Sequence, residues 1–158
     1  MATTFFVGTP LTAEFIATPA ALITVNDRPA LAFDAATDEI AYWTGICPQG
    51  FTGTSTLLVY YIMASATANA VRFDAAIEAV TDADATDLDA TTSFDTANAV
   101  DETVPGTAGY LGVASITLTT QDSLTAGDYF RLRLTRDANH ANDTATGDCR
   151  VLSVELRY

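Results

Sequence analysis

The chain has 158 residues, a length that suits one domain with a hydrophobic core of its own. Its apolar content of 49% favours a globular fold over disorder. The formal net charge is −13, and the sequence has seven arginines and no lysine, which argues against binding to nucleic acid or to an anionic membrane surface because both partners need a basic surface.

The acidic composition has two explanations, which are solubility through charge repulsion and adaptation to high salt. The N-terminal sequence lacks the basic segment and the long apolar run of a secretory signal. No window approaches the roughly 20 apolar residues of a membrane-spanning helix. We therefore expect the protein to be made in a cytoplasm.

The first 28 residues are rich in Thr, Ala and Pro and contain only weak apolar pairs. For residues 1–28 we expect an N-terminal arm with one or two short strands. The arm either packs on its own domain or reaches a neighbouring molecule as an attachment segment. Residues 29–158 are expected to form a single domain.

Within residues 29–158, apolar and polar residues alternate in about eight segments separated by turn-forming residues. The segment 71–80 alternates with a period of two, although its alanines would also allow a helix. This spacing predicts an all-β fold, an antiparallel β-sandwich, and the long connections favour a jelly-roll of about eight strands. The predicted strands are 29–34, 39–47, 54–64, 71–80, 93–104, 111–119 and the two strands of a hairpin within 127–158.

The C-terminal hairpin predicts one apolar and one charged face in each strand. In its first strand, the core-facing set is Phe130, Leu132 and Leu134, and the opposite set is Tyr129, Arg131, Arg133 and Thr135. In its second strand, one face carries Leu152, Val154 and Leu156, and the other carries Val151, Ser153, Glu155 and Arg157.

Five of the seven arginines lie in this hairpin, and arginine is favoured at protein interfaces. We expect these side chains to form a basic stripe on one outward face and to serve as an interface for self-association or for an acidic partner. A solvated face is the alternative. The five residues are Arg131, Arg133, Arg136, Arg150 and Arg157.

Four carboxylates crowd the segment 81–90, and calcium prefers six to eight oxygen ligands from flexible loops of this kind. The spacing does not fit the EF-hand pattern, so a solvated loop is the first interpretation and a calcium site the second. The candidate metal ligands are Asp82, Asp84, Asp87 and Asp89.

The two cysteines, Cys47 and Cys149, follow no metal-binding spacing and lie in or beside predicted strands. We expect two buried free thiols, with a disulfide as the alternative. The only histidine, His140, lies in a polar loop of small residues that is typical of a hairpin connection, and an acid–base or metal site is the second interpretation.

The sequence contains no nucleophile elbow, no zinc-protease motif, no P-loop and no dinucleotide-binding glycine pattern. We therefore expect neither an enzyme nor a cofactor. Aromatic residues that alternate in strands are more typical of a core, although they would also suit a sugar-binding face. The residues concerned are Tyr42, Trp43, Phe51, Tyr60, Tyr61 and Tyr110.

Three segments carry a resemblance to a known group of proteins. They are AGDYFRLRLTRDANHANDTATGDCRVLSVELRY at 126–158, ALAFDAATDEIAYWTGICP at 30–48 and the apolar segment LLVYYIMASA at 57–66. The pattern resembles small structural proteins of tailed bacteriophages and spans about residues 30–158. It is a pattern of strands and loops rather than an active-site motif.

This resemblance implies a virion component with a jelly-roll fold, made in the host cytoplasm. We expect a non-enzymatic capsid decoration or cement protein that assembles as a homo-oligomer, a trimer, on the major capsid protein or another virion protein. Many weak contacts on a lattice would stabilise the shell through avidity. The alternative is a carbohydrate-binding or receptor-binding module associated with a tail spike or fibre.

Overall fold

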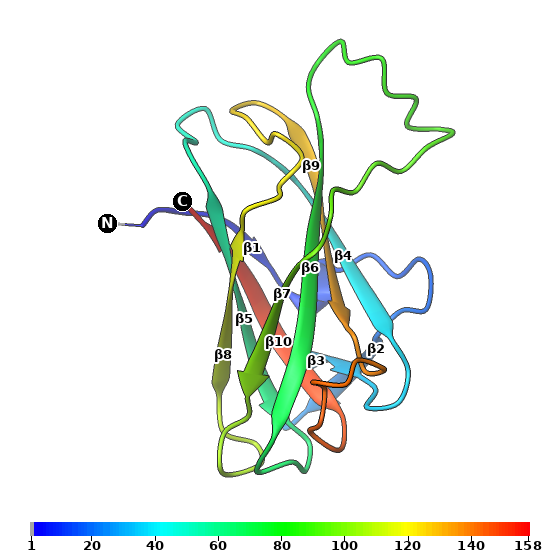
Figure 1. Ribbon diagram of the computed structural model, residues 1–158, viewed down its shortest axis with the longest axis vertical. Helices are drawn as coiled ribbons and strands as arrows, with labels where there is room; N and C mark the ends of the chain where they lie inside the picture. Colours follow the sequence, from blue (N-terminus) through cyan, green and yellow to red (C-terminus); the bar gives the residue numbers. More distant parts are fainter. Residues whose placement is uncertain (1) are drawn as a thin grey trace.

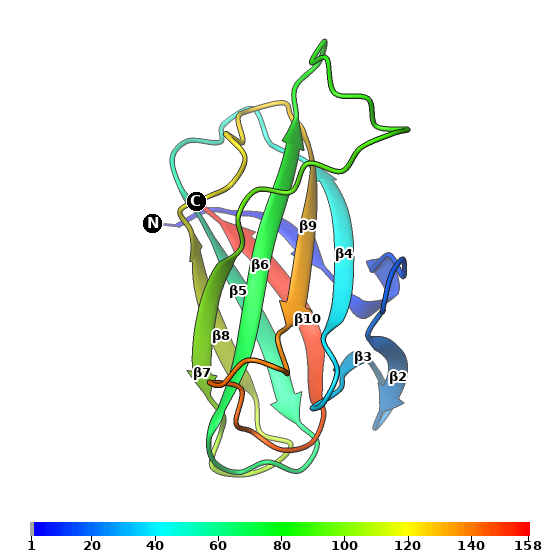
Figure 2. The ribbon, with the colours of Figure 1, turned by 45° about the vertical axis from the view of Figure 1, so that its right-hand side comes forward.

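A computed structural model describes residues 2–158, which form two antiparallel sheets packed face to face (Figure 1). Figure 2 shows one sheet in front of the other, with both chain ends at the same side of the molecule. The prediction of an all-β antiparallel sandwich with a jelly-roll architecture is confirmed. The ten strands are β1 (Thr4–Gly8), β2 (Ala21–Val25), β3 (Arg28–Phe33), β4 (Glu39–Ile46), β5 (Ser55–Met63), β6 (Ala70–Val80), β7 (Asn98–Thr103), β8 (Gly112–Leu118), β9 (Tyr129–Arg136) and β10 (Cys149–Arg157).

Sheet A has the strand order β2-β3-β10-β5-β8, and β1 also pairs with β10. Sheet B has the order β4-β9-β6-β7. All pairs of neighbouring strands are antiparallel, and the segment predicted to be either strand or helix, 71–80, is part of β6. The only helix within residues 2–158 is a short 3-10 turn, Pro10–Thr12, and no helix there is long and apolar enough to cross a membrane.

The core lies between the two sheets and is formed by the side chains that point inward from alternate positions of each strand. In β5 the alternation is complete, so every second side chain from Ser55 to Met63 is buried. Trp43 is 1% exposed, and its indole Nε1 donates a hydrogen bond to the carbonyl oxygen of Thr9 over 3.0 Å. Each fully buried large apolar side chain contributes about 1.5–3 kcal/mol, so the sandwich is stabilised mainly by these inner faces.

The N-terminal 28 residues contain two short strands, β1 and β2, as expected for this segment, in addition to the eight predicted within residues 29–158. β1 pairs with the second half of β10, and β2 pairs with β3. Gly8, at the end of β1, lies so close to Trp43 that an added Cβ would be 2.8 Å from the indole ring. The arm therefore packs on its own domain, which is the first of the two alternatives left open by the sequence.

Strand β10 departs from the predicted alternation because it contains a β-bulge. Its pairing with β5 shifts between Val151 and Ser153, so Leu152 is an extra residue in the register. A bulge resets which side chains face the core. Val151 is buried, and Leu152 turns to the outer side of sheet A beside Arg150, so the predicted faces of this strand are corrected.

Both cysteines are buried free thiols, as the first interpretation predicted. Burial, together with the nearby charge of Asp128, raises the pKa of Cys47 to about 11. Burial also raises the pKa of Cys149. The thiols belong to the core, and neither is activated.

Candidate functional site

The five arginines of the C-terminal hairpin do not form one stripe, so that prediction is wrong in its geometry. β9 belongs to sheet B and β10 to sheet A, so their outward side chains lie on opposite faces of the sandwich. Arg131 and Arg133 lie on the outer side of sheet B, and Arg150 and Arg157 lie on the outer side of sheet A. The sequence suggested a hairpin, but β9 and β10 are not paired with each other.

Arg136, the fifth of these residues, is 0% exposed. Its guanidinium donates to both carboxylate oxygens of Asp143, over 3.0 and 2.8 Å, and to the carbonyl oxygens of Phe33, Gly147 and Ala145. This network ties the 137–148 loop to the body of the domain. Arg136 is therefore a structural residue and not part of an outward interface.

On the outer side of sheet B, arginines and aromatic rings form a closed cluster. The guanidinium of Arg131 lies 5.1 Å from the ring centre of Tyr42 and 5.4 Å from that of Phe94, and it pairs with the buried carboxylate of Glu78. Arg133 lies 4.9 Å from the centre of Phe94. The arginines thus lie over these two rings, and both Tyr42 and Phe94 are only partly exposed.

The acidic segment forms part of the long loop between β6 and β7, which extends beyond the end of sheet B (Figure 1). Its carboxylates bond locally: Asp84 accepts from the backbone N–H of Thr81, and Asp87 accepts from that of Asp89. Within residues 2–158 no group of three or more acidic, histidine or cysteine side chains is placed to hold a metal ion. The predicted ligands Asp82, Asp84, Asp87 and Asp89 are not brought together.

The remaining candidates are mostly structural. His140 accepts a hydrogen bond at Nδ1 from the backbone N–H of Asn142, inside its own loop. The six aromatic residues considered for a sugar-binding face are mostly covered. Trp43, Phe51 and Tyr61 are buried, Tyr42 and Tyr60 are partly buried, and Tyr110 is 65% exposed.

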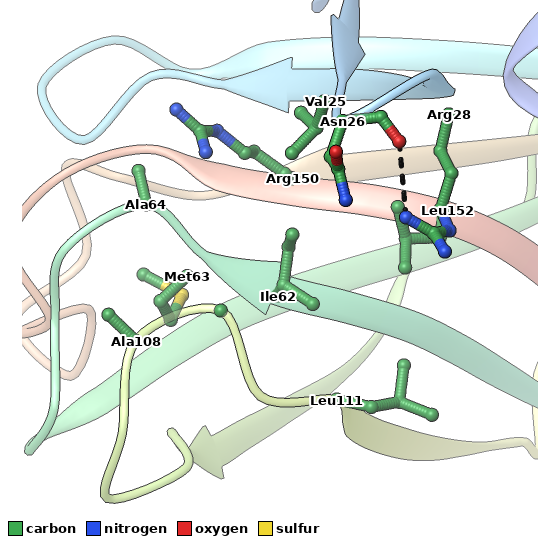
Figure 3. A pocket seen from close by; sticks show the side chains of 11 residues that line it. Val25, Asn26, Arg28, Ile62, Met63, Ala64, Ala108, Leu111, Arg150 and Leu152 are labelled. Atoms are coloured by element: carbon green, nitrogen blue, oxygen red, sulfur yellow. Dashed lines mark hydrogen bonds between the residues drawn. The ribbon is translucent and has the colours of Figure 1, made fainter.

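A cleft opens on the outer side of sheet A. It has a volume of about 500 Å³ and lies between the β2–β3 hairpin and the loop that precedes β8, with β5 and β10 as its floor (Figure 3). The floor and walls are mainly apolar, and three polar side chains reach the cleft. The lining residues are Val25, Asn26, Arg28, Ile62, Met63, Ala64, Ala108, Gly109, Leu111, Arg150 and Leu152.

One wall is set by the tight turn of the β2–β3 hairpin. Val25 pairs with Arg28, which leaves Asn26 and Asp27 as a two-residue turn with φ of 46° and 63°. Both values are left-handed, as a type I′ turn requires, and Asn and Asp tolerate them well. Arg28 donates to the carbonyl oxygen of Asn26 over 3.1 Å, so the turn also orients its guanidinium.

The floor depends on the bulge in β10. Because Leu152 is turned outward, its side chain joins Ile62 on the outer side of sheet A, and both line the cleft. A second hollow of about 380 Å³ shares Arg28 and Leu152 and continues toward Pro10 and Leu11. The two hollows therefore adjoin at these two side chains.

This cleft was not predicted from the sequence. Asn26 and Asp27 are residue types that tolerate the left-handed backbone of a turn, but they lie in the segment expected to be an arm. Arg28 and Arg150 are far apart in the sequence and line the same cleft only because β3 pairs with β10. The outward position of Leu152 had no signal in the alternation.

No family model and no curated protein matches the chain. Among solved structures, the chain is similar to an isomalto-dextranase of Arthrobacter globiformis complexed with panose, at a TM-score of 0.53 and 19% identity. That similarity covers 98% of this chain and spans only 23% of the enzyme chain. At this identity it establishes the fold alone.

Two further structures have TM-scores below 0.5. One is a family 35 carbohydrate-binding module of Clostridium thermocellum, with a TM-score of 0.48, 12% identity and coverage of 99% of this chain and 97% of that one. The other is a C-terminal CBM6 of a laminarinase, LamC, of Zobellia galactanivorans, with a TM-score of 0.44, 11% identity and coverage of 99% and 100%.

Proposed function

We propose that the chain is a non-catalytic carbohydrate-binding module and that the cleft on the outer side of sheet A holds the sugar. The observation that carries the proposal is the cleft itself: an apolar floor with Asn26, Arg28 and Arg150 as hydrogen-bond donors. Its volume of about 500 Å³ falls within the range of pockets for small ligands, roughly 300–1,000 Å³.

The chemistry of the lining suits a sugar, which has both apolar C–H faces and a ring of hydroxyl groups. The side-chain amide of Asn26 and the planar guanidinium groups of the two arginines can each bond to neighbouring hydroxyls. The side chains of Ile62, Leu111 and Leu152 supply the apolar surface on which the C–H face of a sugar ring can pack.

The lining also supports a binding role rather than a catalytic one. Glycoside hydrolysis in most enzyme families needs two carboxyl groups that flank the scissile bond. The cleft is lined by no Asp, Glu or His. The fold is shared with part of an enzyme complexed with panose, an observation that supports a sugar as the class of ligand.

An array of neutral and acidic oligosaccharides, followed by calorimetry with the best ligand, tests this function. Ile62→Ala is expected to weaken binding about tenfold, since loss of apolar area from the cleft floor costs on the order of 1.4 kcal/mol. Ile40→Ala, on the outer side of sheet B, is the matched control. Absence of binding to every class of glycan would overturn the proposal.

A second candidate, the capsid decoration protein implied by the phage resemblance, is favoured by one observation. Several apolar side chains on the outer side of sheet A are open to solvent, including Leu11 at 69%, Leu111 at 58% and Val113 at 40%. Such a surface suits contact with a second copy or with a shell protein. Light scattering tests it: a trimer that Leu111→Asp converts to a monomer would favour this candidate, and a monomeric wild-type protein would oppose it.

A further inference from the structure

We infer that the ligand of the cleft is an acidic oligosaccharide, whose carboxylate groups pair with Arg28 and Arg150. This inference rests on the proposed function and adds the charge and the length of the ligand. Three features of the structure support it: the distribution of ion pairs, the lack of acidic residues in the cleft lining and the spacing of the two arginines.

Four of the seven arginines have acidic partners within the chain. Arg72 pairs with Asp74, Asp101 and Asp137; Arg131 pairs with Glu14 and Glu78; Arg136 pairs with Asp143; and Arg157 pairs with Glu155. Across residues 2–158, the other three arginines form no ion pair, and two of the three, Arg28 and Arg150, line the cleft.

Arg150 is the clearer example of an arginine without an acidic partner. It is only partly exposed, and its Nε is buried without a hydrogen-bond partner in the described part of the chain. A charged guanidinium is stabilised most by a carboxylate that accepts two parallel hydrogen bonds. A chain with 20 acidic residues places none of them in the lining of this cleft.

The acidity of the whole protein does not oppose an acidic ligand at this place. At physiological ionic strength, charges farther than about 8 Å are largely screened. The lining itself carries two positive charges and no negative one. The carboxylate nearest to it along the chain is that of Asp27, which is exposed in the β2–β3 turn and does not line the cleft.

The spacing of the arginines sets the length of the ligand. Arg150 is paired with Ala32, and Arg28 lies four residues before Ala32 on the same strand. At about 3.3 Å per residue this offset is roughly 13 Å along the strands. Figure 3 shows the two side chains on opposite sides of Val25 and Asn26. A ligand that reaches both is an oligosaccharide with more than one acid group.

The test compares oligogalacturonates of one to six units with neutral gluco-oligosaccharides of equal length, by calorimetry on the full chain. The variants are Arg28→Gln and Arg150→Gln, with Arg133→Gln as the matched control because it is the third unpaired arginine and lies on sheet B. An array with other uronate, sialylated and sulfated oligosaccharides accompanies the titrations, so that the choice of one uronate does not decide the result.

We expect carboxylated oligosaccharides to bind at least tenfold more tightly than neutral ones of the same length. Each cleft substitution should weaken binding of the longer acidic ligands about tenfold, as the loss of one charge-assisted pair implies. Arg133→Gln should leave the affinity unchanged. A single uronate unit should respond to at most one of the two substitutions.

Other results would overturn the inference in distinguishable ways. Equal binding of neutral and acidic ligands would remove the acidic ligand and leave glycan binding in place. Binding of sulfated glycans alone would assign the anion to sulfate instead of carboxylate. No binding of any glycan would remove the proposed function as well, and equal losses in all three variants would place the ligand outside the cleft.

Discussion

Replacing Asp143 by alanine tests whether the buried network around Arg136 holds the 137–148 loop. The two side chains are 0% and 1% exposed, and the closest contact between their charged groups is 2.8 Å. Removing one partner of a buried pair leaves the other charge uncompensated, which costs about 3–5 kcal/mol. We therefore expect Asp143→Ala to lower the free energy of unfolding by about that amount.

Urea denaturation followed by tryptophan fluorescence measures this change, because Trp43 is buried in the core. With a denaturant slope of about 2 kcal/mol/M, the midpoint should fall by roughly 1.5–2.5 M. Asp101→Ala is the control, since Asp101 pairs with Arg72 at the surface, where a salt bridge contributes about 0–1 kcal/mol. A fall in the midpoint no larger for Asp143→Ala than for Asp101→Ala would refute the reasoning.

Three further predictions concern pH, packing and the thiols. Hydrogen bonding to Arg157, and then to neighbouring hydroxyls, lowers the pKa of Glu155 to about 2, so the stability that the ionised Glu155 gives the fold is present above about pH 4.3 and is lost as the pH falls toward 2. Urea midpoints between pH 2 and 5 should therefore depend less on pH in Glu155→Gln than in the wild type, and an equal pH dependence in the two proteins would oppose this. Gly8→Ala should lower the free energy of unfolding by about 1–3 kcal/mol, because the new methyl group would clash with Trp43; thermal unfolding checks it, and an unchanged melting temperature would contradict the close packing of β1. Because burial raises the pKa of Cys47 to about 11 and Cys149 is also buried, a thiol reagent should label both cysteines only after unfolding, and rapid labelling of the native protein would be the contrary result.

The inner faces of the sandwich could be predicted from the sequence because their alternation is local. Phe130, Leu132 and Leu134 alternate with charged neighbours, and the structure buries all three. Arg136 is charged like the outward residues Arg131 and Arg133, but it occupies an inward position of the alternation, where its guanidinium donates a hydrogen bond to the carboxylate of Asp143. An ion pair that becomes buried by loop closure leaves no signal in the periodicity of a strand.

The cleft could not be predicted for a related reason. It depends on one extra residue in β10, on a turn in the first 28 residues and on strand pairing between distant segments. A bulge changes the outward set by a single position, and the sequence of β10 contains no glycine or proline to mark it. The jelly-roll architecture was accessible from spacing, and the site built on it was not.

Filling the cleft is the most direct test that it is the binding site, whatever the charge of the glycan. Ala108 lines the cleft, and Ala85 lies exposed in the loop between β6 and β7. Calorimetry with the strongest ligand from the array should show that Ala108→Trp abolishes binding, because the indole occupies the space of the sugar, and that Ala85→Trp binds as the wild type does. Undiminished binding by a correctly folded Ala108→Trp variant would contradict the assignment of the cleft as the glycan site.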